Sequence, residues 1–158
     1  MKRLAFLMAL GILASCGNKP AEQTERKTLG ESTFPGDFVT EEYAQRAEGY
    51  DWTAVSITAA SDTTAHISIR SRADVKNPTC TFDGDGTLTH NGDTLVVAKE
   101  GSHIFFTLRG DTLSISSDDP SLLYYYCSGG ATLQGDYLKL HEALDKSQLT
   151  PAEPQPEP

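Results

Sequence analysis

The chain has 158 residues, the length of a single domain, and a formal charge of −9 at pH 7. An acidic surface repels phosphate backbones, which argues against nucleic acid as a partner. With 38% hydrophobic and 22% charged residues, the composition suits one globular domain with modest tails and argues against a second domain. The charge serves solubility, and if it selects a partner, that partner is a cationic protein.

Residues 1–15 have the pattern of a secretory signal peptide. Two basic residues are followed by an apolar run over residues 4–13, which is shorter than the ~20 residues needed to span a membrane. The run ends in Leu13-Ala14-Ser15-Cys16, which resembles the bacterial lipobox, whose Cys is acylated before cleavage. The resemblance implies a lipidated Cys16 that anchors the protein to a membrane of the bacterial cell envelope. Gly17 is compatible with the outer membrane, and loss of the leader leaves a charge of −11.

Lipidation of Cys16 leaves Cys80 and Cys127 as the other two of the three cysteines. Export places them in an oxidising compartment, where two thiols in a small domain usually pair. We therefore predict a disulfide between Cys80 and Cys127. Two thiols without a CxxC or His spacing are a poor metal site, and no metal is expected.

Composition divides the mature chain into a tether, a domain and a tail. Residues 16–37 are polar and broken by Gly and Pro, which predicts a disordered tether after the lipidated Cys. Residues 38–145 are the predicted β-domain, and the Pro/Glu-rich residues 146–158 predict a disordered tail. A short helix is expected near the start of the domain, between Thr40 as its N-cap and Gly49 as its end.

The hydrophobic pattern has a period of two, which predicts an all-β domain. Val55 and Ile57, then Ile67 and Ile69, alternate with polar residues on either side of a turn at residues 61–64. Tight turns at regular spacing predict eight or nine short antiparallel strands. The expected fold is a meandering barrel or a sandwich, preceded by the short N-terminal helix.

Two turns make the strand register testable. Placing two-residue turns at Asn91-Gly92 and Gly110-Asp111 brings apolar residues opposite one another in both hairpins. A slip of one residue would send these side chains to the solvent face, so the agreement supports the register. The predicted pairs are Leu88 with Leu95, Leu108 with Leu113, and Phe106 with Ile115.

The end of the domain contains the unusual run Tyr124-Tyr125-Tyr126-Cys127-Ser128-Gly129-Gly130. We predict strands at residues 122–127 and 131–138, joined by a turn at the Ser-Gly-Gly sequence. If Cys127 faces inward, alternation places Tyr125 inside and leaves Tyr124 and Tyr126 on the other face. Exposed tyrosines beside a glycine loop suit recognition, and packing under the tether or helix explains them equally well. The candidate partner-binding residues are Tyr124, Tyr126, Ser128, Gly129 and Gly130.

Three cations lie close together at Arg70, Arg72 and Lys76. On a strand, Arg70 and Arg72 share the face opposite Ile67 and Ile69, where they are either solvated or form an anion-binding rim.

The chain contains no recognisable catalytic motif. There is no Gly-x-Ser-x-Gly elbow or phosphate loop, and the four histidines, far apart in sequence, are expected on the surface. Residues 83–87 start like a calcium loop, but Leu88 and Thr94 stand where an EF-hand needs Gly and Glu. The tripeptide Arg109-Gly110-Asp111 is explained by the predicted turn. We expect no enzyme activity and no cofactor.

Residues 127–140 resemble the closing hairpin of small lipocalin-like lipoprotein domains. The related membrane-bound inhibitors of C-type lysozyme are acidic, lipobox-anchored, disulfide-linked barrels that insert a Ser-Gly loop into the enzyme. Ser128-Gly129 is the candidate counterpart here, although Cys127 precedes this loop and no Trp or Cys follows it. The expected function is a non-enzymatic binding lipoprotein of the envelope, with lysozyme inhibition, transport of a small apolar ligand, or a purely structural role as alternatives.

Overall fold

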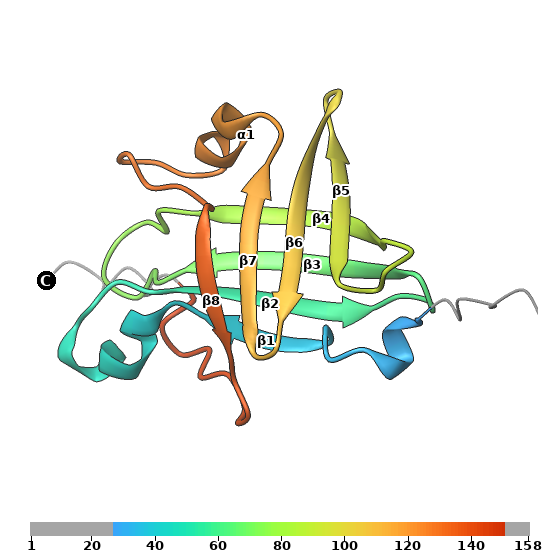
Figure 1. The fold of residues 1–158 in the computed structure, drawn as a ribbon. Coiled ribbons are helices and arrows are strands. Elements are labelled where there is room, and N and C mark those ends of the chain that lie inside the picture. The colour runs from blue at the N-terminus through green and yellow to red at the C-terminus, as the bar shows by residue number, and fades with distance from the viewer. Residues whose placement is uncertain (1–26, 151–158) are drawn as a thin grey trace, which may run out of the picture.

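The computed structural model describes residues 27–150 and consists of a closed barrel of eight antiparallel strands (Figure 1). Each strand pairs with its neighbour in chain order, and β8 pairs with β1 to close the barrel. The all-β prediction is confirmed, and the fold is the barrel, not the sandwich. The strands are β1 (Gly36–Val39), β2 (Thr53–Ala59), β3 (Thr64–Ser71), β4 (Thr81–Leu88), β5 (Thr94–Lys99), β6 (Ser102–Arg109), β7 (Thr112–Ser117) and β8 (Gly135–Lys139).

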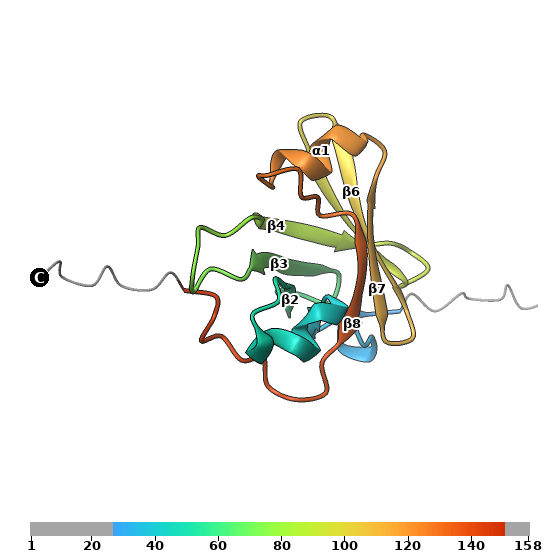
Figure 2. The same cartoon turned by 90° about the vertical axis from the view of Figure 1, so that its left-hand side faces the viewer.

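Three short helices accompany the strands in the described part of the chain. Two are 3₁₀ helices, η1 (Leu29–Glu31) and η2 (Glu41–Glu48), and the third is the α-helix α1 (Pro120–Tyr125) between β7 and β8. Figure 2 shows α1 beyond one end of the barrel, above β4. Within residues 27–150, no helix has the length and apolarity needed to cross a membrane. The signal peptide, Cys16 and residues 151–158 lie outside the described residues.

The predicted register is confirmed at both hairpins. Leu88 lies opposite Leu95, and the β6–β7 pairing places Leu108 opposite Leu113 and Phe106 opposite Ile115. The side chains of these pairs face the barrel interior, where they pack in the main hydrophobic core. Burial of one strand face therefore selected the register, as the alternation implied.

The turn between β4 and β5 differs from the predicted two-residue turn. The loop is wider, the amide of Gly92 donates to the carbonyl of Thr89 at 2.9 Å, and Gly92 has a φ of +71°. The register is nevertheless unchanged, because the amide of Thr89 still donates to the carbonyl of Thr94. The β6–β7 turn carries its positive φ at Gly110.

The folded part begins before residue 38. Leu29 and Phe34 are fully buried in the main core, although both stand in the segment expected to be a tether. The amide of Leu29 donates to the carbonyl of Asp62 at 2.8 Å, which ties the segment to the β2–β3 turn. Strand β1 then starts at Gly36. Two separated apolar residues produce no periodic pattern, so only the packed barrel reveals their place.

The expected helix after Thr40 is confirmed as η2, which ends at Gly49 in the left-handed conformation with φ +95°. The Thr40 hydroxyl does not cap this helix but accepts from the amide of Thr53 at 3.2 Å. Tyr43 of η2 packs edge-on against Trp52 at 4.7 Å between ring centroids. Gln148, in the predicted tail, accepts from Trp52 Nε1 at 2.8 Å, so ordered contacts continue past residue 145.

The predicted strand at residues 122–127 is wrong, because α1 occupies this position. Asp119 is the N-cap and accepts from the amide of Ser121 at 3.0 Å, while Pro120 takes the first helical turn, where its missing N–H costs nothing. Leu122 and Leu123 are buried over the barrel end. The last predicted strand is shortened to β8, so residues 128–130 join a helix to a strand and are not a hairpin turn.

Candidate binding surface at the barrel cap

The predicted disulfide between Cys80 and Cys127 is present and joins the loop after α1 to the start of β4. Two backbone hydrogen bonds flank it. Ser128 donates to the carbonyl of Thr79 at 2.7 Å, and Thr81 donates to the carbonyl of Tyr126 at 3.0 Å. We call α1 and the loop that follows it, residues 120–131, the cap of the barrel. The cap is fixed to the sheet by one disulfide and by the two backbone hydrogen bonds beside it.

The three consecutive tyrosines are not arranged as the predicted alternation required. Tyr125 is 77% exposed and Tyr124 is 51% exposed. Tyr126 is half-buried and packs edge-on against Phe82 at 4.8 Å and against Tyr125 at 5.2 Å. Burial, with Glu100 and Tyr125 nearby, raises the pKa of Tyr126. The candidate residue Tyr126 is therefore largely a packing residue, and Tyr125, which the alternation placed inside, is the most exposed of the three.

Residues 128–131 form a tight turn that projects from the cap. The amide of Ala131 donates to the carbonyl of Ser128 at 3.2 Å, and Gly129 and Gly130 have φ of +65° and +81°. Two successive positive φ values are those of a primed turn, which favours glycine. A Cβ at either glycine would meet no atom within 4 Å. The turn is therefore open to a partner, and its shape is set by its own backbone.

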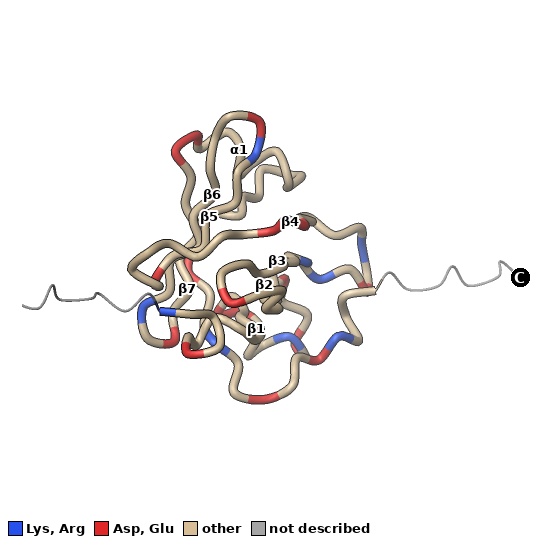
Figure 3. Tube along the Cα trace, turned by 90° about the vertical axis from the view of Figure 1, so that its right-hand side faces the viewer, with Lys and Arg blue, Asp and Glu red and all other residues tan. Residues whose placement is uncertain are grey.

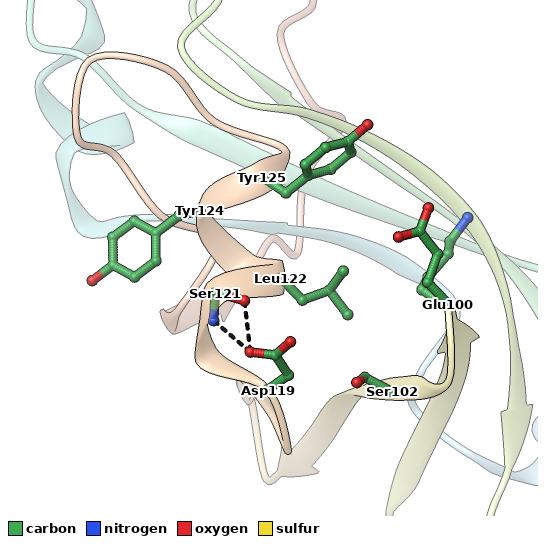
Figure 4. A pocket seen from close by; sticks show the side chains of 8 residues that line it. Glu100, Ser102, Asp119, Ser121, Leu122, Tyr124 and Tyr125 are labelled. Carbon is green, nitrogen blue, oxygen red and sulfur yellow. Dashed lines mark hydrogen bonds between the residues drawn. The ribbon is translucent and has the colours of Figure 1, made fainter.

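A cleft of about 480 Å³ separates α1 from the β5–β6 turn (Figure 4). Figure 4 shows Leu122 and Glu100 directed into this space, with Tyr125 above it and Tyr124 on the other side of α1. The lining mixes charged, hydroxyl and aromatic groups, which suits a polar partner more than an apolar one. The lining residues are Lys99, Glu100, Ser102, Asp119, Ser121, Leu122, Tyr124 and Tyr125.

A second, shallower hollow lies on the other side of Tyr125 and reaches Ser128. Its lining includes Thr79, Thr81 and the disulfide residue Cys127. The end of the barrel that carries α1 thus presents the exposed tyrosines and the Ser-Gly-Gly turn, with Tyr125 lining both hollows and Ser128 bordering the second. We call this face the cap surface and define it by Tyr124, Tyr125, Ser128, Gly129 and Gly130.

Each cation of the candidate anion rim is paired with a carboxylate. Arg70 donates to both oxygens of Asp83, at 2.8 and 3.0 Å, and Lys76 pairs with Asp51. Arg72 does not share a solvated strand face with Arg70, because β3 ends at Ser71 and Arg72 is only 7% exposed.

The Arg72 guanidinium binds Asp74 through two hydrogen bonds, at 2.6 and 3.1 Å. These bonds hold the pKa of the Asp74 carboxyl below its ordinary value. The paired carboxylates leave little positive charge on this rim for an outside anion.

The four histidines are exposed, as expected, and three of them pair with aspartates. Nδ1 of His103 lies 2.8 Å from Asp118, and the hydrogen bond from the His103 amide lowers the pKa of that carboxyl. Among residues 27–150, no three His, Cys, Asp or Glu side chains are grouped closely enough to hold a metal ion. Residues 83–87 lie within strand β4 and not in a loop.

Part of the barrel interior is closed to a ligand by close packing around two glycines of β4. A Cβ at Gly84 would lie 2.8 Å from the Phe82 ring, and one at Gly86 would lie 3.0 Å from Ile67. Both positions face the core, where Phe82, Ile67 and Leu95 are almost fully buried. In this part of the barrel, side chains occupy the space that an apolar ligand would need.

Comparison with protein families, with curated proteins and with solved structures found no match to this chain. The fold and the cap therefore define its class: a small, closed, antiparallel β-barrel domain whose helical cap is held by a disulfide.

Proposed function

We propose that the chain is a lipid-anchored, non-enzymatic binding protein of the bacterial cell envelope, and that it recognises a protein partner through the cap surface. The exposure of Tyr124 and Tyr125 beside an open Ser-Gly-Gly turn is the observation that carries the proposal. Tyrosine contributes a large contact area at a low cost in side-chain entropy and is enriched among residues that dominate binding energy.

The way the cap is held supports this role. The disulfide and the two backbone hydrogen bonds beside it fix the loop before any partner arrives. A surface that is already ordered loses little conformational entropy on binding, so its contacts translate more fully into affinity. The acidity of the chain favours a cationic partner and raises the rate of encounter with it.

The membrane anchor rests on the lipobox, because Cys16 lies outside the described residues. Mass spectrometry of the mature N-terminus should find an acylated Cys16. The Cys16→Ser variant should lose this modification and leave the membrane fraction. A mature protein with an unmodified thiol at this position would remove the anchor from the proposal and leave the cap surface untouched.

The most specific partner to test is a C-type lysozyme, a cationic enzyme whose cleft would take the Ser128-Gly129-Gly130 turn. The projecting turn with open space around both glycines supports this version. We would titrate lysozyme with the purified protein and follow cell-wall lysis. Inhibition should be lost in Ser128→Arg and Tyr125→Ala, and it should persist in Tyr50→Ala, a matched change at a tyrosine that is 49% exposed outside the cap. Unchanged lysis at saturating protein would reject the lysozyme version.

A second experiment tests the cap surface without assuming the partner. A photo-crosslinking amino acid would replace Tyr125 or Tyr50 in the anchored protein in intact cells. We expect a discrete protein adduct from position 125, and none from position 50. Equal labelling from both positions, or none from position 125, would contradict the cap surface as the recognition face.

A further inference from the structure

The cleft between α1 and the β5–β6 turn has the size of a small-ligand site. Its volume is about 480 Å³, and such sites typically measure roughly 300–1,000 Å³. One wall is the β5–β6 turn, where Lys99 and Ser102 lie opposite one another in the strand ladder. The other wall is α1 together with its N-cap residue Asp119. A ligand in this space would contact two elements that are separate in sequence.

Hydrogen bonds tie the two walls together at the base of the cleft. The amide of His103, near the start of β6, donates to the Asp118 carboxylate at 2.7 Å. The Ser117 hydroxyl, at the end of β7, donates to the carbonyl of His103 at 2.7 Å. The disulfide at Cys127 holds the chain just beyond α1. The cleft is therefore formed before a ligand arrives, so little conformational entropy is lost on binding.

The carboxylates of the cleft retain hydrogen-bonding capacity. Within residues 27–150, Glu100 takes part in no ion pair. In Figure 4, hydrogen bonds among the lining residues join only Ser121 to Asp119. Oδ1 of Asp119 accepts from the amide and the hydroxyl of Ser121, at 3.0 and 2.7 Å. The Glu100 carboxylate and the second oxygen of Asp119 are thus left to accept from a ligand.

Lys99 adds donors to the same cleft. Its Nζ donates to the carbonyl of Asp83 at 3.3 Å and lies 5.4 Å from the centroid of the Phe82 ring. These contacts hold the ammonium at the wall of the cleft and use only one of its three N–H donors. Because no ion pair joins Lys99 to a described carboxylate, the other donors remain for a ligand.

The mixture of charges favours a neutral ligand over an ion. Figure 3 shows acidic and basic residues together at the α1 end of the barrel. A free anion would face Glu100 and Asp119, and a free cation would face Lys99. A ligand rich in hydroxyl groups gains from both signs, because a hydroxyl both donates and accepts, and hydrogen bonds to charged groups are the stronger ones.

The apolar part of the cleft matches the ring of a sugar. Figure 4 shows the Tyr125 ring above the space and the side chain of Leu122 directed into it. A pyranose presents C–H groups on its faces and hydroxyls around its edge, and the face of an aromatic ring attracts such C–H groups. Tyr125 is 77% exposed, whereas a site for a free small molecule encloses roughly 70–90% of its ligand. The open cleft therefore suits one unit of a longer chain.

We propose that the cleft between α1 and the β5–β6 turn binds a neutral sugar unit of a glycan, which stacks on Tyr125 and donates hydroxyl hydrogen bonds to Glu100 and Asp119. The ammonium of Lys99 donates to a further hydroxyl. This inference goes beyond the proposed function, which concerns a protein partner of the cap surface. The cleft and the cap surface share their tyrosines, whereas Glu100 belongs only to the cleft and Ser128 only to the cap surface.

The first test titrates the purified, disulfide-bonded protein with short neutral oligosaccharides of glucose, mannose, galactose or N-acetylglucosamine, followed by backbone NMR. We expect at least one of them to bind saturably, with shifts concentrated at the amides of Glu100, Ser102 and Tyr125. No saturable binding by any of them at up to about 10 mM would overturn the proposal. Saturable shifts located away from the cleft would overturn it as well.

Two further probes check the class of ligand. An oligosaccharide of uronic acids should bind at least about fivefold more weakly than the best neutral one, because its carboxylates would approach Glu100 and Asp119. A blocked peptide of Ser and Asn carries hydrogen-bonding groups without a sugar ring and should not bind saturably. Tighter binding of either probe than of every neutral sugar would overturn the assignment to a neutral glycan.

A pair of variants at Tyr125 isolates the stacking contact. Tyr125→Ala removes the ring and should weaken the best sugar at least about tenfold. Tyr125→Phe keeps the ring without its hydroxyl and should change the affinity less than about twofold. Because the side chain is exposed, both variants should fold. Equal losses in the two variants, or none in Tyr125→Ala, would overturn the stacked arrangement.

A second pair tests the carboxylate with a matched control. Glu100→Gln keeps the size of the side chain but replaces a charged acceptor, and we expect it to weaken the sugar about fivefold. Glu42→Gln makes the same change at an exposed position of η2 and should leave the affinity unchanged. Equal affinities of Glu100→Gln and Glu42→Gln would overturn the role of Glu100 in the cleft.

The variants also separate this inference from the proposed function. Ser128→Arg leaves the cleft intact and should bind the sugar like the wild type even when the cap partner is lost. Glu100→Gln should weaken the sugar and keep the protein partner. Sugar binding in a protein without a cap partner would remove the proposed function alone, and a cap partner without sugar binding would overturn this inference alone.

Discussion

The phenol of Tyr137 should make stability depend on pH in a narrow alkaline window. Tyr137 lies on β8, is 3% exposed, and donates to the carbonyl of Leu133 at 3.0 Å. Burial raises the pKa of Tyr137 from its ordinary value near 10 to about 12. In the unfolded chain the phenol ionises near pH 10, so between pH 10 and 12 only the folded state holds the proton.

The sign of the effect follows from proton linkage. The contribution of Tyr137 is fully present below pH 10 and is lost as the pH rises through its folded-state pKa, since the unfolded state releases its proton first. A pKa raised by about two units corresponds to about 3 kcal/mol of unfolding free energy lost across this window. The Tyr137→Phe variant has no phenol and should not show this loss.

At neutral pH the same variant should be less stable by about 1 kcal/mol, because the Leu133 carbonyl loses its donor. Urea unfolding followed by the fluorescence of the buried Trp52 measures both effects at a series of pH values. The comparison is between the two proteins at each pH, so titration of the other tyrosines and lysines cancels. Parallel stability curves for wild type and Tyr137→Phe between pH 10 and 12 would refute the reasoning.

Three further changes test other parts of the fold. Replacing both Cys80 and Cys127 by Ala should lower the unfolding free energy by about 4 kcal/mol, because the disulfide constrains the unfolded chain over 47 positions. A loss below about 1 kcal/mol in urea unfolding would contradict this prediction. Glu100, in the β5–β6 turn, is the only described non-glycine residue with a positive φ, +49°. Because Asn adopts this conformation more readily than Glu, Glu100→Asn should stabilise the turn by about 1 kcal/mol and raise the melting temperature. An unchanged or lower melting temperature would count against backbone strain at this position. Leu29→Ala should cost about 2–5 kcal/mol in chemical unfolding if this residue is core, whereas a tether residue would cost nothing measurable.

The barrel's strands were predictable where two local signals agreed. In the β6–β7 hairpin, the turn residues and the apolar alternation independently require Leu108 opposite Leu113, and this pairing is present. The β4–β5 register was also correct although the turn at Gly92 is wider than predicted, because burial of Leu88 and Leu95 decides the register.

The cap was mispredicted because a short apolar run fits a strand and a helix equally well. Residues 122–127 alternate acceptably, yet Leu122 and Leu123 must both be buried, which a six-residue helix allows and a one-sided strand does not. The signal that could have identified the helix is Asp119-Pro120, an N-cap followed by proline. The same error placed Tyr125 inside and Tyr126 outside, whereas Tyr125 is the most exposed of the three tyrosines and Tyr126 is half-buried.

By itself, the sequence determined the all-β class and the register of two hairpins, because both depend on spacing along the chain. It also determined the disulfide partners, because Cys80 and Cys127 are the two cysteines that remain besides Cys16. Only the tertiary structure decided that the sheet closes, that Leu29 and Phe34 complete its core, and that β4 and β5 separate after two pairs. These features depend on packing between residues far apart in sequence. No local pattern encodes that packing, so the cap surface emerges only from the folded barrel.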